Sequence, residues 1–378
     1  MNHKNLFAFS LLAASILFSR TFAIAEEGDN PVLRDKISLI VRSVDFERQS
    51  AKFEEYGKIP YGFPAEITLN RSNKSYSLYF NAEGVAENNQ YYDLKLTKHG
   101  SYKIELASNQ IPHQFVYDGK TFYSGIGTGN LTVPPAMQKD LQGSTSSGNA
   151  ASKLINTYLP GAYSKDISLT RKRAEVNLDV FSMEPLDLKV QVTNEKREGT
   201  RPWSGSFGFG NAIELPEPVD YDTTGMKLSA EYAPRKNIYV NANYSMSTFK
   251  NNIDTLTFDN PFRSADSTAA TAYAANYAAG PSKGLIDLYP DNRYNSLSLN
   301  WAFTDLPMGS RISATTSKGW MYQNDALVPY TTNTAIKTGA VSGVAGKTVP
   351  FNAYDPANLP QTNVDAKVET QLINLAFV

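Results

Sequence analysis

The residues with the greatest chemical reactivity are scarce in this chain. It has no cysteine, and its three histidines are His3, His99 and His113. Without cysteine there is no thiolate nucleophile, no disulfide, no cysteine-ligated metal and no Cys-x-x-Cys-His site for a c-type haem. Because His99 and His113 are far apart in the chain, we expect structural or surface roles for both rather than a metal site.

Three short runs resemble functional motifs but lack the required context. "SGIGTGN" (124–130) lacks the spacing of a phosphate-binding loop, and no helical pattern follows it, so we predict a β-turn. "GSFGFGN" (205–211) sets glycines beside aromatic residues, as in a strand bend or bulge. "RKR" (171–173) is interpreted as a basic turn between strands rather than an anion site. We therefore name no catalytic, cofactor-binding or metal-binding residue, and we predict that the protein is not an enzyme.

The overall charge and the N-terminus indicate where the protein works. A net charge of −1 argues against a nucleic-acid partner, since phosphate binding needs an excess of lysine and arginine. Lys4 precedes an apolar run over 6–18, and "AIA" ending at Ala25 fits a cleavage site. We predict a signal peptide over 1–25. No other apolar run approaches the roughly 20 residues of a transmembrane helix.

The elements that position the remaining side chains repeat with a period of two. In "YNSLSLNWAFT" the residues Leu297, Leu299, Trp301 and Phe303 share one face, and Ser296, Ser298 and Asn300 share the other. The same alternation recurs around 92–97, 174–180, 186–192, 224–232 and 238–247. Such alternation predicts strands with one apolar and one polar face.

The strands and their connections predict a single β domain over 26–378. It holds about a dozen strands, many near the 9–11 residues that cross a membrane. Short turns are expected at 98–101, 183–185, 233–237 and 304–310, and long polar loops near 134–153, 260–284 and 324–363. Short turns alternating with long loops are typical of an outer-membrane barrel.

Two all-β architectures remain open on periodicity alone. A secreted sandwich also alternates, but its apolar faces are dense in branched aliphatic residues. Here the polar face is rich in Asn, Ser and charged residues, and aromatic residues gather near strand ends. These features favour a transmembrane antiparallel β-barrel of the bacterial outer membrane.

Three segments resemble the MtrB/PioB family of outer-membrane proteins associated with decahaem cytochromes. The first, 208–262, contains "LPEPVDYDTT" and "LTFDNPF"; the second is "IPHQFVYDGKTFYSGIGTGNLTVPP" (111–135); the third is "NLPQTNVDAKVETQLINLAF" (358–377). The resemblance extends from about residue 90 to the end. It identifies 215–221 as a hairpin connection, in which the prolines end one strand before the next begins.

The resemblance implies a barrel that sheathes a multihaem c-type cytochrome, so that electrons cross the outer membrane. This chain would bind no cofactor itself, because haem c belongs to periplasmic or extracellular cytochrome partners, and its outer surface would meet outer-membrane lipid. Some family members carry a Cys-x-x-Cys near the mature N-terminus, which this chain lacks.

Family members are also considerably longer than this chain. We therefore expect either a C-terminal truncation or a smaller closed barrel. Two other functions stay open: a diffusion porin or substrate channel without a cytochrome, and a secreted β-rich enzyme or adhesin.

Overall fold

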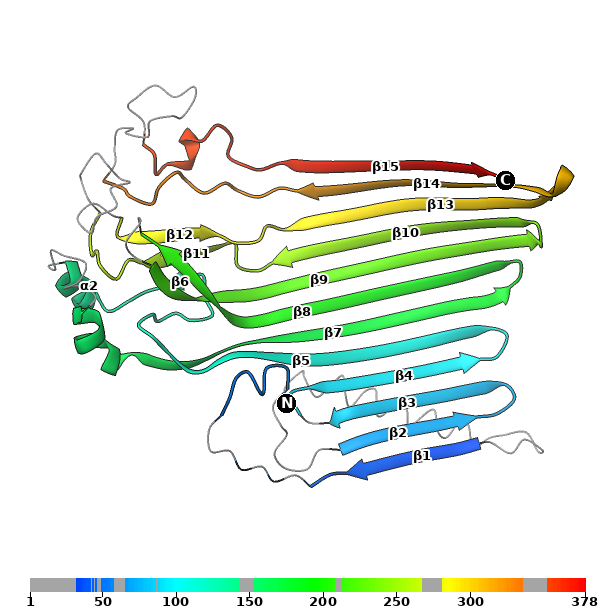
Figure 1. The fold of residues 1–378 in the computed structure, drawn as a ribbon, viewed down its shortest axis with the longest axis horizontal. Coiled ribbons are helices and arrows are strands. Elements are labelled where there is room, and N and C mark those ends of the chain that lie inside the picture. Colours follow the sequence, from blue (N-terminus) through cyan, green and yellow to red (C-terminus); the bar gives the residue numbers. More distant parts are fainter. Residues whose placement is uncertain are drawn as a thin grey trace.

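A computed structural model of the chain describes residues 32–57 except 42, 44 and 46–48, then 65–142 except 86, and 152–207, 212–266, 281–335 and 352–378. The predicted signal peptide lies outside these residues. Twelve strands form one antiparallel sheet (Figure 1). In sheet order they are β1 (Val32–Leu39), β2 (Ala65–Ser72), β3 (Tyr76–Val85), β4 (Gln90–Lys98), β5 (Tyr102–Thr121), β7 (Tyr163–Met183), β8 (Leu186–Ser206), β9 (Ala212–Arg235), β10 (Ile238–Asn251), β13 (Asn292–Leu306), β14 (Ser310–Gln323) and β15 (Ala366–Phe377).

The sheet is an up-and-down meander, since its strand order follows the chain order. Across the described residues it is open, because β1 pairs only with β2 and β15 only with β14. The described strands therefore do not form the smaller closed barrel that the sequence left open.

The connections differ at the two ends of the strands, as the sequence predicted. Short turns join β2 to β3, β4 to β5, β7 to β8, β9 to β10 and β13 to β14, and all lie at the edge that also holds the C-terminus (Figure 1). Gly100 makes the β4–β5 turn possible with a φ of +72°, a conformation that is costly for other residues. The connections over 122–162, 252–291 and 324–365 leave from the opposite edge, which we call the long-loop edge.

The expected hairpin connection at 215–221 is wrong, because these residues lie inside β9. Pro216 pairs with Pro202 and Pro218 with Thr200 on β8. On its other side β9 pairs with β10 only from Tyr221 onward. The prolines are tolerated because this part of β9 has a strand neighbour on one side only, so the missing donors break no second ladder.

One face of the sheet is apolar next to the short turns. The register places Val176, Val192 and Met226 side by side on β7, β8 and β9, and Leu178, Val190 and Leu228 form the adjacent row. Many of these side chains are exposed, including Val176, Val192 and Leu228, as are Leu297 (54%) and Ile373 (71%) further along the sheet. A contiguous row of exposed apolar side chains indicates a surface that meets lipid.

The apolar band is shorter than the longest strands. On β10 it runs from Ile238 to Met246, about 27 Å along the strand at about 3.4 Å per residue. Strand tilt reduces that length toward the roughly 25 Å height of an outer-membrane apolar band. Strands β7, β8 and β9 have 21, 21 and 24 residues. Toward the long-loop edge the same face therefore turns polar, with Lys172, Lys196 and Asp222 in register.

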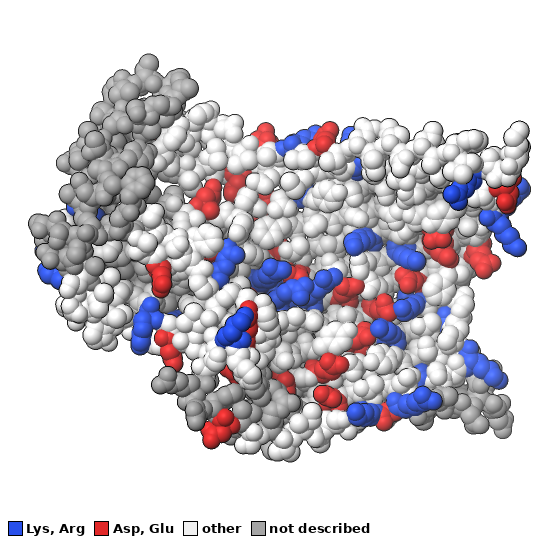
Figure 2. All heavy atoms as spheres, viewed as in Figure 1, with Lys and Arg blue, Asp and Glu red and all other residues white. Residues whose placement is uncertain are grey.

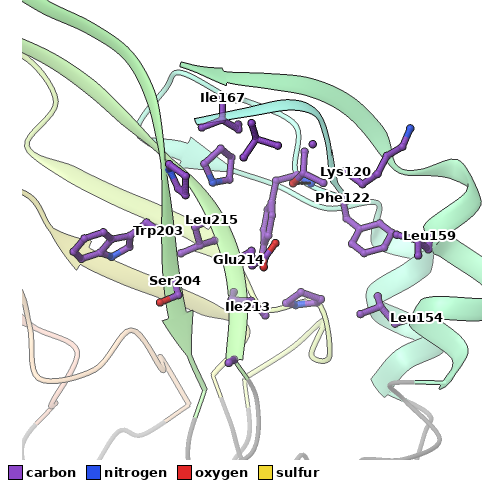
Figure 3. A pocket seen from close by; sticks show the side chains of 18 of the residues that line it. Lys120, Phe122, Leu154, Leu159, Ile167, Trp203, Ser204, Ile213, Glu214 and Leu215 are labelled. Atoms are coloured by element: carbon purple, nitrogen blue, oxygen red, sulfur yellow. Dashed lines mark hydrogen bonds between the residues drawn. The ribbon is translucent and has the colours of Figure 1, made fainter. Parts of the chain in front are cut away.

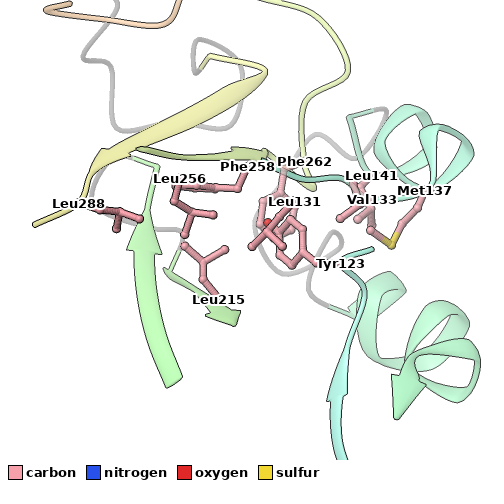
Figure 4. Packing of buried hydrophobic residues seen from close by; sticks show 10 residues of the cluster. All are labelled: Tyr123, Leu131, Val133, Met137, Leu141, Leu215, Leu256, Phe258, Phe262 and Leu288. Atoms are coloured by element: carbon pink, nitrogen blue, oxygen red, sulfur yellow. The ribbon is translucent and has the colours of Figure 1, made fainter. Parts of the chain in front are cut away.

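A small hydrophobic core lies at the long-loop edge (Figure 4). It packs helix α2 (Pro135–Gln142) and a three-stranded sheet of β6 (Asn130–Leu131), β11 (Thr255–Asp259) and β12 (Lys283–Asp287) near the ends of β5 and β9. Met137, Leu131 and Leu256 are fully buried in it, together with Leu215 of β9. The β-turn predicted at 124–130 is confirmed just before β6, because the backbone N–H of Thr128 donates to the Gly125 carbonyl at 3.0 Å.

Candidate functional site: the polar face of the sheet

The strongest candidate site is the face opposite the apolar band, which we call the polar face. Its residues come from alternate positions of neighbouring strands and are held in line by the register. The rows include Asn81, Asp93, Ala107 and Glu175, and further along Asn243, Ser298 and Ser317. The polar face is thus an extended wall rather than a point-like active site.

The part of the wall carried by β4 to β9 holds ionised side chains, and we call it the charged sector. Its members include Asp93, Lys95, Lys103, Glu105, Arg171, Arg173, Glu175, Lys189, Glu195, Arg197 and Lys227. Lys103 pairs with Glu105 at 2.7 Å, and Lys95 contacts Asp93 at 3.1 Å. Ten residues of β4, β5 and β7 line a shallow hollow of about 380 Å³ in this sector.

The basic run at 171–173 was predicted to be a turn, and that prediction is wrong. These residues lie inside β7. Arg171 pairs with Glu195 at 2.5 Å and Arg173 with Glu175 at 2.8 Å, both on the polar face. Lys172 points to the opposite face and pairs with Glu198. Each basic residue has an acidic partner, so the run does not form an anion site, and only its two arginines contribute to the wall.

The part of the wall carried by β10, β13 and β14 has no ionised side chain at the alternate described positions within 241–247, 296–302 and 313–319 that face it, and we call it the neutral sector; Lys318, in register with Leu297, lies on the opposite face. Its side chains are Asn241, Asn243, Ser245, Ser247, Ser296, Ser298, Asn300, Ala302, Ser313, Thr315, Ser317 and Gly319. Figure 2 shows this face, with blue and red side chains gathered over β4 to β9 and a broad uncharged area over β10 to β14.

Amide and hydroxyl groups bond to one another within the neutral sector. Asn243 donates to Asn241 and to the Ser298 hydroxyl, the latter at 3.5 Å. Asn300 also donates to Asn241, at 3.4 Å. The neutral sector is therefore lined by short polar side chains that project little from the sheet. Its boundary with the charged sector falls between β9 and β10.

A separate cavity of about 750 Å³ lies at the long-loop edge (Figure 3). Ile167, Ile213 and Leu215 line it from one side and Phe122, Leu154 and Leu159 from the other. Its volume lies within the range of small-molecule sites. The cavity lies beside the small hydrophobic core, since Tyr123, Leu215 and Phe262 belong to both.

A buried ion pair braces the strands at this cavity. Glu217 is 1% exposed and accepts two hydrogen bonds from Arg201, at 2.6 and 2.8 Å. The Arg201 guanidinium also lies 5.3 Å from the rings of Trp203 and Tyr289. Sequence reasoning missed this pair, although Arg and Glu at facing positions of a hairpin form a recurring cross-strand contact.

Asp266 joins two of the long connections. Its Oδ1 accepts from the backbone and hydroxyl of Ser282, and its Oδ2 accepts from those of Thr334, all at 2.8 Å. Burial alone would raise the pKa of Asp266, but these hydrogen bonds outweigh it and hold that pKa below its usual range. We call this arrangement the Asp266 clamp.

The two described histidines lie apart from each other. His99 is in the β4–β5 turn, whereas His113 is in β5, stacked on Tyr56 with ring centroids 4.7 Å apart and with its Nε2 3.3 Å from Glu55. Within the described ranges, no group of three or more potential metal-ligating residues comes together. Among the same residues, no helix has the length and apolarity to cross a membrane.

Comparison with known proteins places the chain in a family. Residues 47–378 match the family model for the outer membrane β-barrel porin MtrB/PioB. The outer membrane protein MtrB of Shewanella baltica (strain OS185) is 27% identical over 331 residues, which are 86% of this chain and 41% of that protein. The chain thus spans less than half the length of this relative.

Solved structures give only a distant likeness. OmpT of Vibrio cholerae, as expressed in the outer membrane, is 9% identical with a TM-score of 0.32, covering 92% of this chain and 77% of that one. The CymD monoaromatic hydrocarbon channel is 11% identical with a TM-score of 0.22, covering 80% and 85%. These scores are too low to carry an argument. On the family match, the chain belongs to the MtrB/PioB family of β-barrel proteins, and it resides in the outer membrane.

Proposed function

We propose that this chain forms the wall of a barrel that encloses a multihaem c-type cytochrome, so that electrons pass between the periplasm and the cell exterior. The chain acts as an insulating sheath and not as an enzyme. Its apolar band faces lipid, and its polar face lies toward the partner. The partner is a periplasmic cytochrome, an extracellular one, or both in contact.

One observation carries the proposal: a wide polar face lies opposite the apolar band in a chain that has no cysteine. Electrons must cross roughly 30 Å of hydrocarbon, and that requires a series of cofactors. This chain has no thiol with which to hold haem c covalently. The haems of a conduit must therefore belong to a second protein, and the polar face is the surface available to hold it.

A diffusion channel is the second candidate, because hydroxyl and amide groups like those of the neutral sector also suit a water-filled pore. The two functions differ in what fills the barrel. An occupied barrel blocks ions, whereas an empty one conducts them in a planar bilayer.

The test is to purify the intact protein by affinity from detergent-solubilised outer membranes and record its visible absorption. A c-type Soret band, with a haem-staining polypeptide that co-elutes in fixed ratio, is the expected result. A colourless folded protein that conducts ions would overturn the sheath proposal in favour of the channel.

A further inference from the structure

We infer that the cytochrome lies against the neutral sector of the polar face, through a patch of its surface that is polar but uncharged. The inference rests on the proposed function, because it assigns the side of the wall on which that partner sits. The charged sector then faces a water-filled gap between the wall and the partner.

The charged sector is poorly suited to close contact. Arg173 and Glu175 pair at 2.8 Å, and Arg197 and Glu195 also pair at 2.8 Å, so these ions are already compensated within the wall. A partner pressed against them would strip their water without supplying a missing counter-charge. Removing water from ion pairs is costly even when the pairing is kept.

The neutral sector lacks this penalty. Amides such as Asn241 and Asn300 already bond to each other, and their burial removes no ion from water. The serine and threonine hydroxyls rotate, and each can donate or accept toward a partner. The short side chains also let another protein's surface approach the sheet closely.

The absence of charge at the described positions of this sector also specifies the partner's patch. A lysine or carboxylate brought against Ser296, Ser298 or Thr315 would be buried with no counter-charge on the wall. An unpaired buried charge weakens binding strongly. The complementary surface is therefore rich in hydroxyl, amide and small side chains.

The test places a charge in each sector and measures the haem retained by the purified barrel. Ser298→Glu and Ser298→Lys introduce either sign at the centre of the neutral sector. Ser298→Gln is the uncharged match for the glutamate, and Gln191→Lys is the control in the charged sector. Gln191 donates to Glu175 at 2.7 Å, so a lysine there keeps that contact.

Both charged variants at Ser298 are expected to lose at least about tenfold in haem per barrel. Ser298→Gln and Gln191→Lys should match the wild-type protein. Equal retention in all four variants, loss with only one sign of charge, or equal loss for Gln191→Lys would overturn the inference. A wild-type barrel without haem would instead refute the proposed function itself.

A second experiment locates the partner on the wall without depending on a change in its affinity. A photo-crosslinking amino acid at position 298 should link the chain to a haem-staining polypeptide, whereas the same residue at position 191 should not. Crosslinking from 191 in preference to 298 would place the partner on the charged sector and overturn the inference.

Discussion

Two adjacent residues of β13 should differ in how strongly the same substitution to arginine destabilises the barrel. Leu299 lies in the apolar band, opposite Ala242 of β10 and Thr316 of β14. Ser298 points to the other face, between Asn243 and Ser317. We compare Leu299→Arg with Ser298→Arg in the intact protein.

The expected difference follows from where each arginine is placed. Leu299 lies near the middle of the run from Leu297 to Phe303, so its arginine enters the centre of the lipid-facing band. An arginine at the bilayer midplane of a barrel costs about 2–4 kcal/mol, which is roughly 30- to 700-fold in the folding equilibrium. In the barrel folded without its partner, the arginine of Ser298→Arg points into water and should cost less than about 1 kcal/mol.

The assay is a urea titration of the protein folded into phosphatidylcholine vesicles, followed by tryptophan fluorescence and by heat-modifiable migration. Leu299→Arg should shift the midpoint to lower urea at unchanged slope, and Ser298→Arg should leave it in place. Equal shifts would show that this face of β13 does not meet lipid. A larger shift for Ser298→Arg would invert the assignment of the two faces.

Two further predictions concern the long-loop edge. Glu217→Gln leaves Arg201 without its charged partner and should destabilise the outer part of the β8–β9 hairpin by about 2–3 kcal/mol, as measured by amide hydrogen exchange. The control is Glu214→Gln, at an exposed position of the same strand. Equal protection of the hairpin amides in the two variants would contradict the role of the ion pair. Because the folded-state pKa of Asp266 is lowered, its clamp stabilises the loops above about pH 5 and weakens as the pH falls through that lowered pKa. Exchange at the Ser282 and Thr334 amides, corrected for intrinsic rates, should therefore accelerate in acid, and Asp266→Asn should remove that pH dependence; an unchanged dependence in the variant would refute it.

The alternating strands were predictable because each carries its own signal. In β13 the row Leu297, Leu299, Trp301 and Phe303 fixes the strand and its apolar face within a single segment. The short turns were predictable for the same reason, since their residues are local. The division of the polar face into two sectors, by contrast, appears only when the register sets Asn243, Ser298 and Ser317 in one row.

The errors arose where neighbours outside the local sequence decide the structure. Pro216 and Pro218 suggested a break in the strand. β9 continues through them because β8 is its only strand neighbour there, so the missing proline N–H groups break no second ladder. Arg171 and Arg173 suggested a turn, whereas acidic partners on β7 and β8 compensate them inside the sheet. Strands as short as β6, with two residues, carry no period for a sequence pattern to reveal.

Electron transfer across a sealed membrane tests the sheath proposal most directly. Vesicles would enclose an electron acceptor, and a reduced soluble redox protein, too large for a pore, would be added outside. The acceptor should be reduced only when the barrel and its haem partner are both present. Reduction with the barrel alone, or none with the intact complex, would contradict the sheath proposal.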